Sequence, residues 1–336
     1  LVIVRLSDVQ PERINWLWRN RIPRDKVSVL GGMAGLGKTF ATLDMASRVS
    51  TGEPWPDLPD DPIEVGSVVI LNLEDGLGDT IRPRLDAMGA NLDKIVAVEG
   101  VYEIDKQGRR MFNITQDVHH LELVIEQLGD ARLVILDPLT AYIGSKLDSW
   151  RDNEVRAVLY PLGELAKRCK VAVVGVMHVR KSPSDKAMFR VLGSVAFTAY
   201  ARAVWLIGED RDSDDPDCRL LLPVKLNIAR AAPGLRFRIT DRGVVEWLGD
   251  TDTTADEAFA PADPEDAGPK VKSAIEWLKG VLADGAQAAM AIKAQARENC
   301  IAARTLDRAK SRLKVVASNE GVFGQAWYWS LPESKP

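Results

Sequence analysis

Eight consecutive residues near the start of the chain have the types and spacing of a phosphate-binding loop. Gly32 is followed by four residues and then by Gly37, Lys38 and Thr39, after the short apolar run 26–30 and before a helical pattern. Glycines let backbone N–H groups turn toward the phosphates of a nucleotide. The following helix presents its positive N-terminal end to them. This spacing therefore predicts a P-loop within a strand–loop–helix unit.

Each part of this loop has an expected task. Lys38 is predicted to reach the β- and γ-phosphates, and the Thr39 hydroxyl to ligate Mg²⁺, so the expected cofactors are ATP and Mg²⁺. The alternative is a glycine-rich turn that only looks like a P-loop, and the strand–loop–helix context argues against it. The residues expected to hold the nucleotide are Gly32, Met33, Ala34, Gly35, Leu36, Gly37, Lys38 and Thr39.

Polar side chains also follow three later apolar runs. Glu74, Asp137 and His178 each stand at or just beyond the end of such a run. Ligands bind at the carboxyl ends of strands in open α/β sheets, so we expect these side chains near the phosphates. Asp137 completes a Walker B pattern and is predicted to hold Mg²⁺ through water. The alternatives are an ordinary Asp-Pro turn at Asp137 and a structural histidine at His178.

Composition limits the class of protein. The chain has 336 residues, 46% of them hydrophobic, which suits a soluble globular protein of about two domains. Its three cysteines form no C-x-x-C pair, so neither a zinc site nor a disulfide framework is indicated, and a reducing, cytoplasmic setting is expected. The sequence contains no signal peptide and no 18-residue apolar run, so no membrane partner is expected.

The order of patterns predicts two folded parts. Alternating strand and helix patterns over residues 1–248 predict an α/β core with a mostly parallel central sheet. Residues 249–269 hold seven acids and no base, which predicts an acidic flexible linker. Residues 270–336 read as three short helices and a terminal β-hairpin, the pattern of a winged helix-turn-helix domain.

The C-terminal part is the basic part of the chain. Residues 270–314 hold ten bases and four acids, although the net charge of the whole chain is −4. Arg304, Arg308 and Arg312 are spaced so that they form one stripe along the third predicted helix. A recognition helix meets DNA with such a stripe. The alternative is a solvated helix face in a winged helix that docks to a protein.

Taken together, these motifs give the chain a family resemblance. Over about residues 15–245 it resembles the RepA-like hexameric replicative helicases, within the RecA/DnaB class of P-loop ATPases, which implies a RecA-like core. The resemblance rests on Leu73-Glu74-Asp75, Leu136-Asp137-Pro138, Met177-His178-Val179-Arg180-Lys181, Gly193-Ser194 leading to Ala201-Arg202, and Lys225-Leu226-Asn227.

The resemblance implies individual roles. Glu74 looks like the base that polarises the attacking water, and His178 like the sensor of the γ-phosphate. Arg202 resembles an arginine finger that reaches the ATP of a neighbouring subunit, and Lys225 is expected to act in trans as well. Arg84 resembles the arginine that packs near adenine.

The implied function is an ATP-dependent DNA helicase or translocase, acting as a hexamer on single-stranded DNA in phage or plasmid replication, with a primase-polymerase as a further partner. Loops 143–153 and 180–192 would then track the strand by its phosphates. Two alternatives stay open: a RecA-type recombinase or mediator, and a DNA-binding regulator with a nucleotide switch. The residues of these loops expected to contact DNA are Lys146, Arg151, Arg180, Lys181, Lys186 and Arg190.

Overall fold

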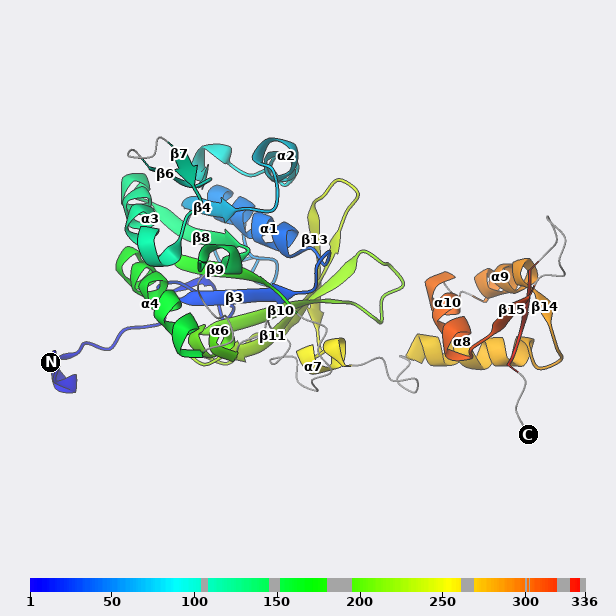
Figure 1. Cartoon of the computed structure of the whole chain (residues 1–336). Helices are drawn as coiled ribbons and strands as arrows, with labels where there is room; N and C mark the ends of the chain where they lie inside the picture. The colour runs from blue at the N-terminus through cyan, green and yellow to red at the C-terminus, as the bar shows by residue number, and fades with distance from the viewer. Residues whose placement is uncertain are drawn as a thin grey trace. The chain divides into compact units, whose positions relative to one another are not determined.

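The computed structural model describes residues 1–103, 108–144, 152–179, 195–260, 269–299, 301, 303–318 and 327–332. The chain divides into two compact units (Figure 1). The first unit, the core, consists of Leu1–Glu209 and Asp217–Phe259. The second, the C-terminal unit, consists of Asp210–Pro216 and Ala260–Pro336.

The core is built on a nine-stranded sheet with the strand order β13-β12-β11-β10-β3-β9-β8-β4-β5. The six strands from β10 to β5 in this order run parallel, and β11, β12 and β13 extend the sheet with antiparallel pairing. The predicted α/β fold with a mostly parallel sheet is confirmed. The strands are β3 (Val27–Gly32), β4 (Ser67–Asn72), β5 (Ile95–Ala97), β8 (Ala131–Asp137), β9 (Ala172–His178), β10 (Ala203–Glu209), β11 (Cys218–Leu226), β12 (Gly234–Ile239) and β13 (Val245–Thr251).

Helices cover both faces of this sheet (Figure 1). On one face, α3, α4, α6 and α7 pack in a single apolar cluster, and on the other face α1 and α2 pack in a second cluster. Strands buried on both faces need continuous apolar runs, which is why β3, β4, β8 and β9 were readable in the sequence. The helices are α1 (Lys38–Thr51), α2 (Arg82–Ala87), α3 (Ile114–Leu128), α4 (Asp152–Cys169), α6 (Val195–Tyr200) and α7 (Ala255–Phe259).

Short elements complete the core. Two small hairpins pair β1 (Trp16–Trp18) with β2 (Ile22–Pro23) and β6 (Val101–Glu103) with β7 (Gly108–Arg110). Single helical turns lie at η1 (Leu6–Asp8), η2 (Leu77–Ile81), η3 (Leu92–Lys94) and η4 (Leu139–Tyr142). Among the described residues, no helix combines the length and the apolar character needed to cross a membrane.

The first part of the predicted linker belongs to the core. Strand β13 continues to Thr251, and α7 follows with Ala258 and Phe259 buried against the sheet. The Thr254 backbone N–H and the Thr254 hydroxyl donate to Glu257, and the Glu257 N–H donates back to the Thr254 hydroxyl, which forms a capping box. The linker prediction was therefore wrong for residues 249–259, because the acids counted there include a helix cap. Residues 261–268 lie outside the described part of the chain.

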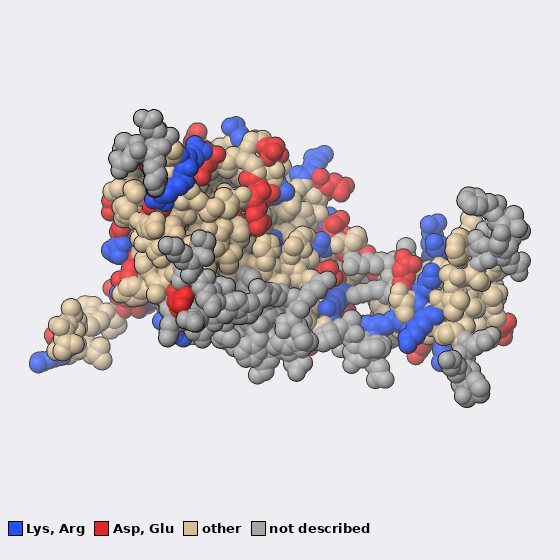
Figure 2. Space-filling model, viewed as in Figure 1, with Lys and Arg blue, Asp and Glu red and all other residues tan. Residues whose placement is uncertain are grey.

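In the residues that the structure describes, the C-terminal unit has three helices and a three-stranded antiparallel sheet of order β14-β16-β15. Its small core includes Leu278, Ile292, Leu306 and Trp329. Basic side chains are conspicuous on this unit in the view of Figure 2. The three helices and the closing strand pair agree with the predicted elements, β14 was not predicted, and the winged-helix class stays a prediction. The elements are α8 (Pro269–Val281), β14 (Gln287–Ala288), α9 (Ala289–Glu298), α10 (Ala303–Arg312), β15 (Val316–Ser318) and β16 (Tyr328–Ser330).

Candidate nucleotide-binding site

Parallel pairing brings the predicted polar side chains to one edge of the sheet. Strand β3 pairs with β9 so that Gly32 lies opposite His178, and β8 pairs with β4 so that Asp137 lies opposite Asn72. The strand order β3-β9-β8-β4 places the P-loop and these strand ends side by side. Glu74 follows β4 by two residues and reaches the same edge.

Glycine is needed both at the last residue of β3 and in the loop that follows this strand. Gly37 has φ +83° and forms the N-cap of α1, and a Cβ atom there would collide with Ile239 Cδ1. A Cβ atom on Gly32 would lie 2.8 Å from the Ile207 carbonyl oxygen of β10. Gly35 also has a positive φ, +78°, in open space. The loop therefore turns through conformations that glycine adopts without strain, with α1 starting directly behind it.

Lys38 points back over the loop. Its Nζ donates to the Met33 carbonyl oxygen at 2.9 Å and lies 3.3 Å from His178 Nδ1. The residue is buried, and burial lowers the pKa of the Lys38 ammonium. The nearby Asp137 and Glu74 carboxylates raise this pKa, but their effect is smaller than that of burial. A cation held against the loop in this way is placed to meet a phosphate.

Thr39 and Asp137 form the second contact of the site. Thr39 Oγ1 donates to Asp137 Oδ2 at 2.7 Å. Asp137 is 3% exposed, and burial raises the pKa of its carboxyl group. A hydroxyl and a carboxylate are hard oxygen ligands of the kind that Mg²⁺ prefers, so these two residues fit a magnesium ion.

Glu74 lies at the open side of the site. Its Oε1 is 3.3 Å from His178 Nε2, and more than half of its side chain is exposed. His178 thus connects the carboxylate of Glu74 to the ammonium of Lys38. A carboxylate that is open to water and close to a phosphate-binding loop can accept a proton from an attacking water molecule.

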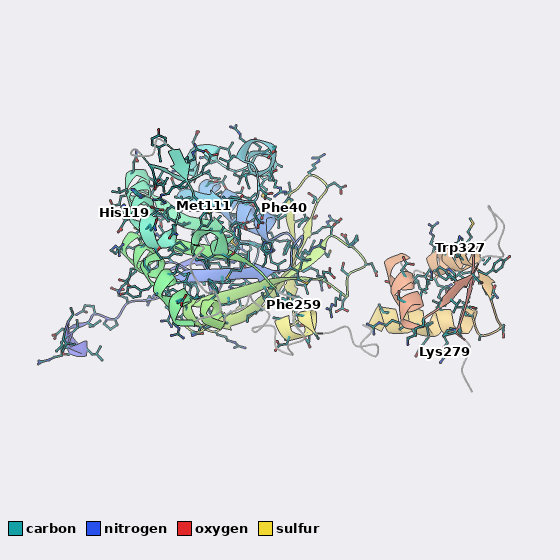
Figure 3. All side chains as sticks on the ribbon, in the orientation of Figure 1. Phe40, Met111, His119, Phe259, Lys279 and Trp327 are labelled. Carbon is teal, nitrogen blue, oxygen red and sulfur yellow. The ribbon has the colours of Figure 1, made fainter. Side chains whose placement is uncertain are left out.

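Arg84 lies beside the first turn of α1. Its guanidinium carbon is 4.2 Å from the centre of the Phe40 ring, and Nη1 donates to Asp75 Oδ2 at 3.2 Å. Sequence reasoning missed Phe40, which is labelled in Figure 3, although an aromatic residue directly after Thr39 was a visible signal. The stacked pair gives the site a flat surface beside the P-loop.

Arg202 and Lys225 lie at the opposite edge of the sheet. The Arg202 N–H donates to the carbonyl oxygen of Val27, the first residue of β3, whereas the P-loop follows the last residue of β3. The Arg202 side chain is exposed. Lys225 Nζ donates to the carbonyl oxygens of Thr198, Ala199 and Ala201 at 2.6–2.9 Å. Neither side chain faces the P-loop of its own chain.

The residues predicted to contact DNA are only partly described. Arg304, Arg308 and Arg312 all belong to α10, as predicted, but the side chains of Arg304 and Arg308 lie outside the described residues. The loop residues outside the described part of the chain are Lys146, Arg151, Arg180, Lys181, Lys186 and Arg190.

A family comparison agrees with this geometry. The model of one protein family, described as AAA domain, matches residues 1–184, which is more than half of the chain and contains the P-loop, Glu74, Asp137 and His178. The chain belongs to this AAA-domain family. No curated protein matched the sequence. The AAA protein is accordingly a P-loop ATPase, and its family implies nucleotide binding with Mg²⁺.

Proposed function

We propose that this AAA ATPase is an ATP-dependent DNA helicase or translocase that works as a ring, with six subunits as the expected number, on single-stranded DNA. One observation carries the proposal. The P-loop, Glu74 and His178 lie at one edge of the sheet, whereas Arg202 stands exposed near the other edge. Strand β3 separates these edges by six residues, or about 20 Å. An arginine so placed can complete an ATP site only in a neighbouring copy.

The proposed hydrolysis uses residues of both edges. Lys38 and the loop N–H groups hold the β- and γ-phosphates, and Thr39 and Asp137 hold Mg²⁺, which supplies positive charge to the phosphates when bound. Glu74 takes a proton from water as the water oxygen attacks the γ-phosphorus. The bond to the β-phosphate oxygen breaks, and ADP and phosphate leave. Arg202 of the neighbouring copy stabilises the charge that develops during this transfer.

Coupling to DNA is proposed to run through His178. The imidazole contacts both Lys38 and Glu74, so loss of the γ-phosphate changes its surroundings. The next residues in the chain include the predicted DNA contacts Arg180 and Lys181. A shift of His178 can therefore be passed to this basic segment through a single intervening residue.

The C-terminal unit is proposed to be a winged-helix domain that binds DNA. Support comes from its element order, helix, strand, helix, helix, strand, strand, and from its excess of basic residues. On this view α10 is the recognition helix. Replication of a phage or plasmid, with a primase-polymerase partner, is the proposed setting, and it rests on the family resemblance alone.

The first test is steady-state ATP hydrolysis with and without single-stranded DNA. We expect single strands to stimulate hydrolysis strongly. Lys38→Ala is expected to abolish the activity. Lys167 is an exposed lysine on α4, and Lys167→Ala is expected to leave the activity unchanged. Strand exchange without unwinding would favour the recombinase alternative. Slow turnover stimulated only by duplex DNA would favour the nucleotide-switch regulator.

A subunit-mixing experiment tests the shared site. Lys38→Ala and Arg202→Ala are each expected to be inactive alone, and a mixture of the two is expected to recover part of the activity. Recovery follows because an intact P-loop of one variant can then meet an intact Arg202 of the other. A mixture as inactive as its components would contradict a site built by two copies.

A further inference from the structure

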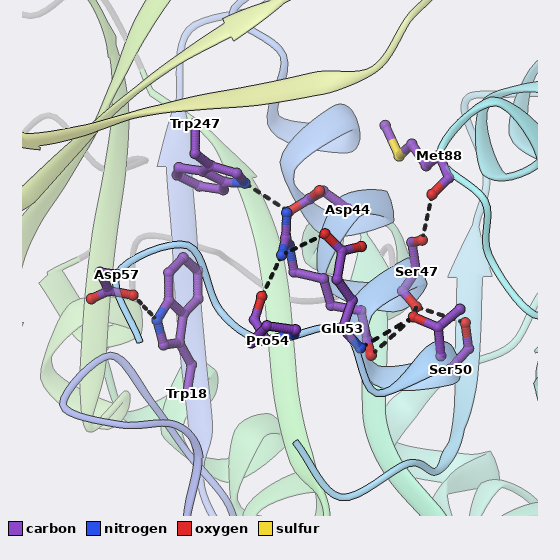
Figure 4. Close-up of polar contacts among 11 residues, drawn as sticks. Trp18, Asp44, Ser47, Ser50, Glu53, Pro54, Asp57, Met88 and Trp247 are labelled. Carbon is purple, nitrogen blue, oxygen red and sulfur yellow. Dashed lines mark hydrogen bonds and ion pairs between the residues drawn. The ribbon is translucent and has the colours of Figure 1, made fainter. Parts of the chain in front are cut away.

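One cluster of charged side chains outside the ATP site is paired within the core. Arg48 on α1 contacts Asp44 at 3.0 Å and Glu53 at 3.1 Å, and the Trp247 indole N–H donates to Asp44 (Figure 4). Asp44 and Arg48 are both buried, so each needs the other as a partner. Pairing of this kind accounts for the cluster as part of the folded core.

A second group of acids belongs to the C-terminal unit. We call the segment Asp210–Pro216, which lies between β10 and β11, the acidic loop, and it is grouped with Ala260–Pro336 and not with the core. Arg211 of this loop donates from its Nη1 to the Ala260 carbonyl oxygen at 2.9 Å. The acids of the loop are Asp210, Asp212, Asp214 and Asp215. These carboxylates therefore lie in the same compact unit as the basic helix α10.

The acidic loop has a defined backbone. Asp210 is buried, its carboxylate accepts from the Asp212 N–H at 3.1 Å, and its carbonyl oxygen accepts from the Ser213 N–H at 3.3 Å. The Ser213 hydroxyl accepts from the Asp215 N–H at 3.1 Å. Side chains that bond their own backbone in this way fix a turn. Asp212 and Asp214 are thus presented at the surface of a loop that is already ordered.

The acidic loop contacts α10. The hydroxyl of Thr305, near the start of this helix, donates to the Asp214 carboxylate, and Thr305 is only 5% exposed. Positions three and seven residues after Thr305 lie on the same side of a helix, and they hold Arg308 and Arg312. The contact therefore lies on the side of α10 that carries the predicted arginine stripe.

The charges of the two elements are complementary. Helix α10 holds four bases and one acid, whereas the acidic loop holds four acids and one base. Because Thr305 is buried, water has limited access to their contact, and opposite charges attract more strongly where water is excluded. DNA would present phosphates to the same arginines. The acidic loop and the backbone of DNA therefore require the same side of α10.

We infer, on the basis of the proposed DNA binding by α10, that the acidic loop is an internal competitor of DNA. Asp214 holds the loop on Thr305, and the neighbouring carboxylates occupy the place of phosphates. Duplex DNA then binds only molecules in which the loop has left α10, so the measured affinity is reduced by the fraction of such molecules. No residue assigned to ATP hydrolysis takes part in the contact between Thr305 and Asp214, so hydrolysis without DNA is expected to be unaffected.

Two full-length variants with the same change of charge test the competition. The first neutralises three acids of the acidic loop: Asp212→Asn, Asp214→Asn and Asp215→Asn. The second neutralises three exposed acids elsewhere in the C-terminal unit: Glu276→Gln, Asp284→Asn and Glu298→Gln. We expect the loop variant to bind a labelled duplex about tenfold more tightly than the parent, and the second variant to differ from the parent by less than about threefold. Fluorescence anisotropy without nucleotide measures both affinities.

A reversible lock tests the contact itself. Asp214→Cys together with Thr305→Cys places two thiols where the side chains meet. In the oxidised full-length chain we expect a disulfide within one chain, identified by mass spectrometry, and duplex binding at least about tenfold weaker than in the reduced chain. The parent carries the native cysteines alone, and its duplex binding is expected to be the same in oxidised and reduced samples.

Three outcomes would overturn the competition. Oxidation that forms no disulfide between positions 214 and 305 would remove the contact. Equal tightening in the two neutralised variants would assign the effect to net charge, and equal duplex binding by the locked and the reduced chain would show that the loop does not cover the DNA-binding side. These results leave DNA binding by the C-terminal unit in place. Absence of duplex binding in every form, the loop variant included, would contradict that proposed function as well as the competition.

Discussion

At the scale of single residues, His178 has the most constrained chemistry. Its Nδ1 faces the Lys38 ammonium, which can only donate, and its Nε2 faces a carboxylate of Glu74, which can only accept when ionised. Both contacts are satisfied by the neutral imidazole with its proton on Nε2. The ring therefore orients the Glu74 carboxylate while it accepts from Lys38, and a phosphate that binds Lys38 changes both contacts.

Glu74→Gln tests the proposed general base. Glutamine keeps the size of the side chain but cannot take a proton, so we expect turnover to fall about 10²–10³-fold with nucleotide binding preserved. Glu126→Gln is the matched control, because Glu126 is an exposed glutamate on α3 to which no role in the site is assigned. Single-turnover hydrolysis and a fluorescent nucleotide titration measure the two effects. A fall of less than about tenfold would exclude Glu74 as the base.

Asp137 is predicted to lower the stability of the nucleotide-free protein. Burial raises the pKa of its carboxyl group, so the folded state disfavours the ionised form. This penalty is absent below the ordinary pKa of about 3.9, grows as the pH rises from that value to the raised pKa, and is constant above it. Asp137→Asn keeps an acceptor for Thr39, so we expect it to melt higher than the parent near pH 7.

Thermal melts of Asp137→Asn and the parent from pH 4 to 8 measure this difference, which is expected to shrink toward acid pH. With nucleotide and Mg²⁺ we expect the parent to melt at the higher temperature, because only the parent has the carboxylate that holds Mg²⁺. A lower melting temperature of the nucleotide-free variant near pH 7 would show that the charge stabilises the fold.

At the scale of elements, the P-loop depends on the β12–β13 hairpin. Ile239, the last residue of β12, packs where a side chain on Gly37 would have to lie. We expect Gly37→Ala to destabilise the core by about 1–3 kcal/mol and to weaken nucleotide binding. Gly35→Ala, at a similar positive φ but with no atom within 4 Å of the added Cβ, carries the backbone strain alone. Urea unfolding of both variants separates strain from collision, and equal losses would rule out the collision.

How far sequence predicts an element depends on whether its cause is local. The apolar runs of β3, β8 and β9 are visible because both of their faces are buried. Strand β14 has two residues and exists only because Gln287 and Ala288 pair with β16. Helix α7 was hidden because its acids were read as a property of the whole segment 249–269.

The candidate site shows the same division. The contact between Thr39 and Asp137 follows from two motifs that were each readable, since both were predicted to serve the same metal ion. The three carbonyl contacts of Lys225 were not readable, because they depend on where α6 ends relative to β11. The proposed partner of Arg202 lies in a neighbouring copy, so it cannot be found from the sequence of one chain. The mixing of the Lys38→Ala and Arg202→Ala variants tests this contact.

At the scale of the whole molecule, the boundary of the core is testable. A chain that ends at residue 260 keeps α7, whereas one that ends at 248 loses α7 and the last residues of β13. Burial of a side chain such as Phe259 contributes about 1.5–3 kcal/mol. We expect urea unfolding to show the shorter chain less stable than the longer by at least that amount. Equal stability of the two chains would show that residues 249–259 do not contribute to the core and belong to the linker.

The ammonium of Lys225 has three protons, and all three are committed to the turn formed by the end of α6 and Ala201, the residue just beyond the helix. A phosphate on a neighbouring copy can therefore recruit Lys225 only by competing with that turn for the same donors. One of the three acceptors belongs to Ala201, directly before Arg202. If Lys225 contacts the nucleotide of a neighbouring subunit, the end of α6 in its own subunit loses these hydrogen bonds and frays. Binding of a nucleotide in one subunit would then reduce the helical order of the adjacent subunit.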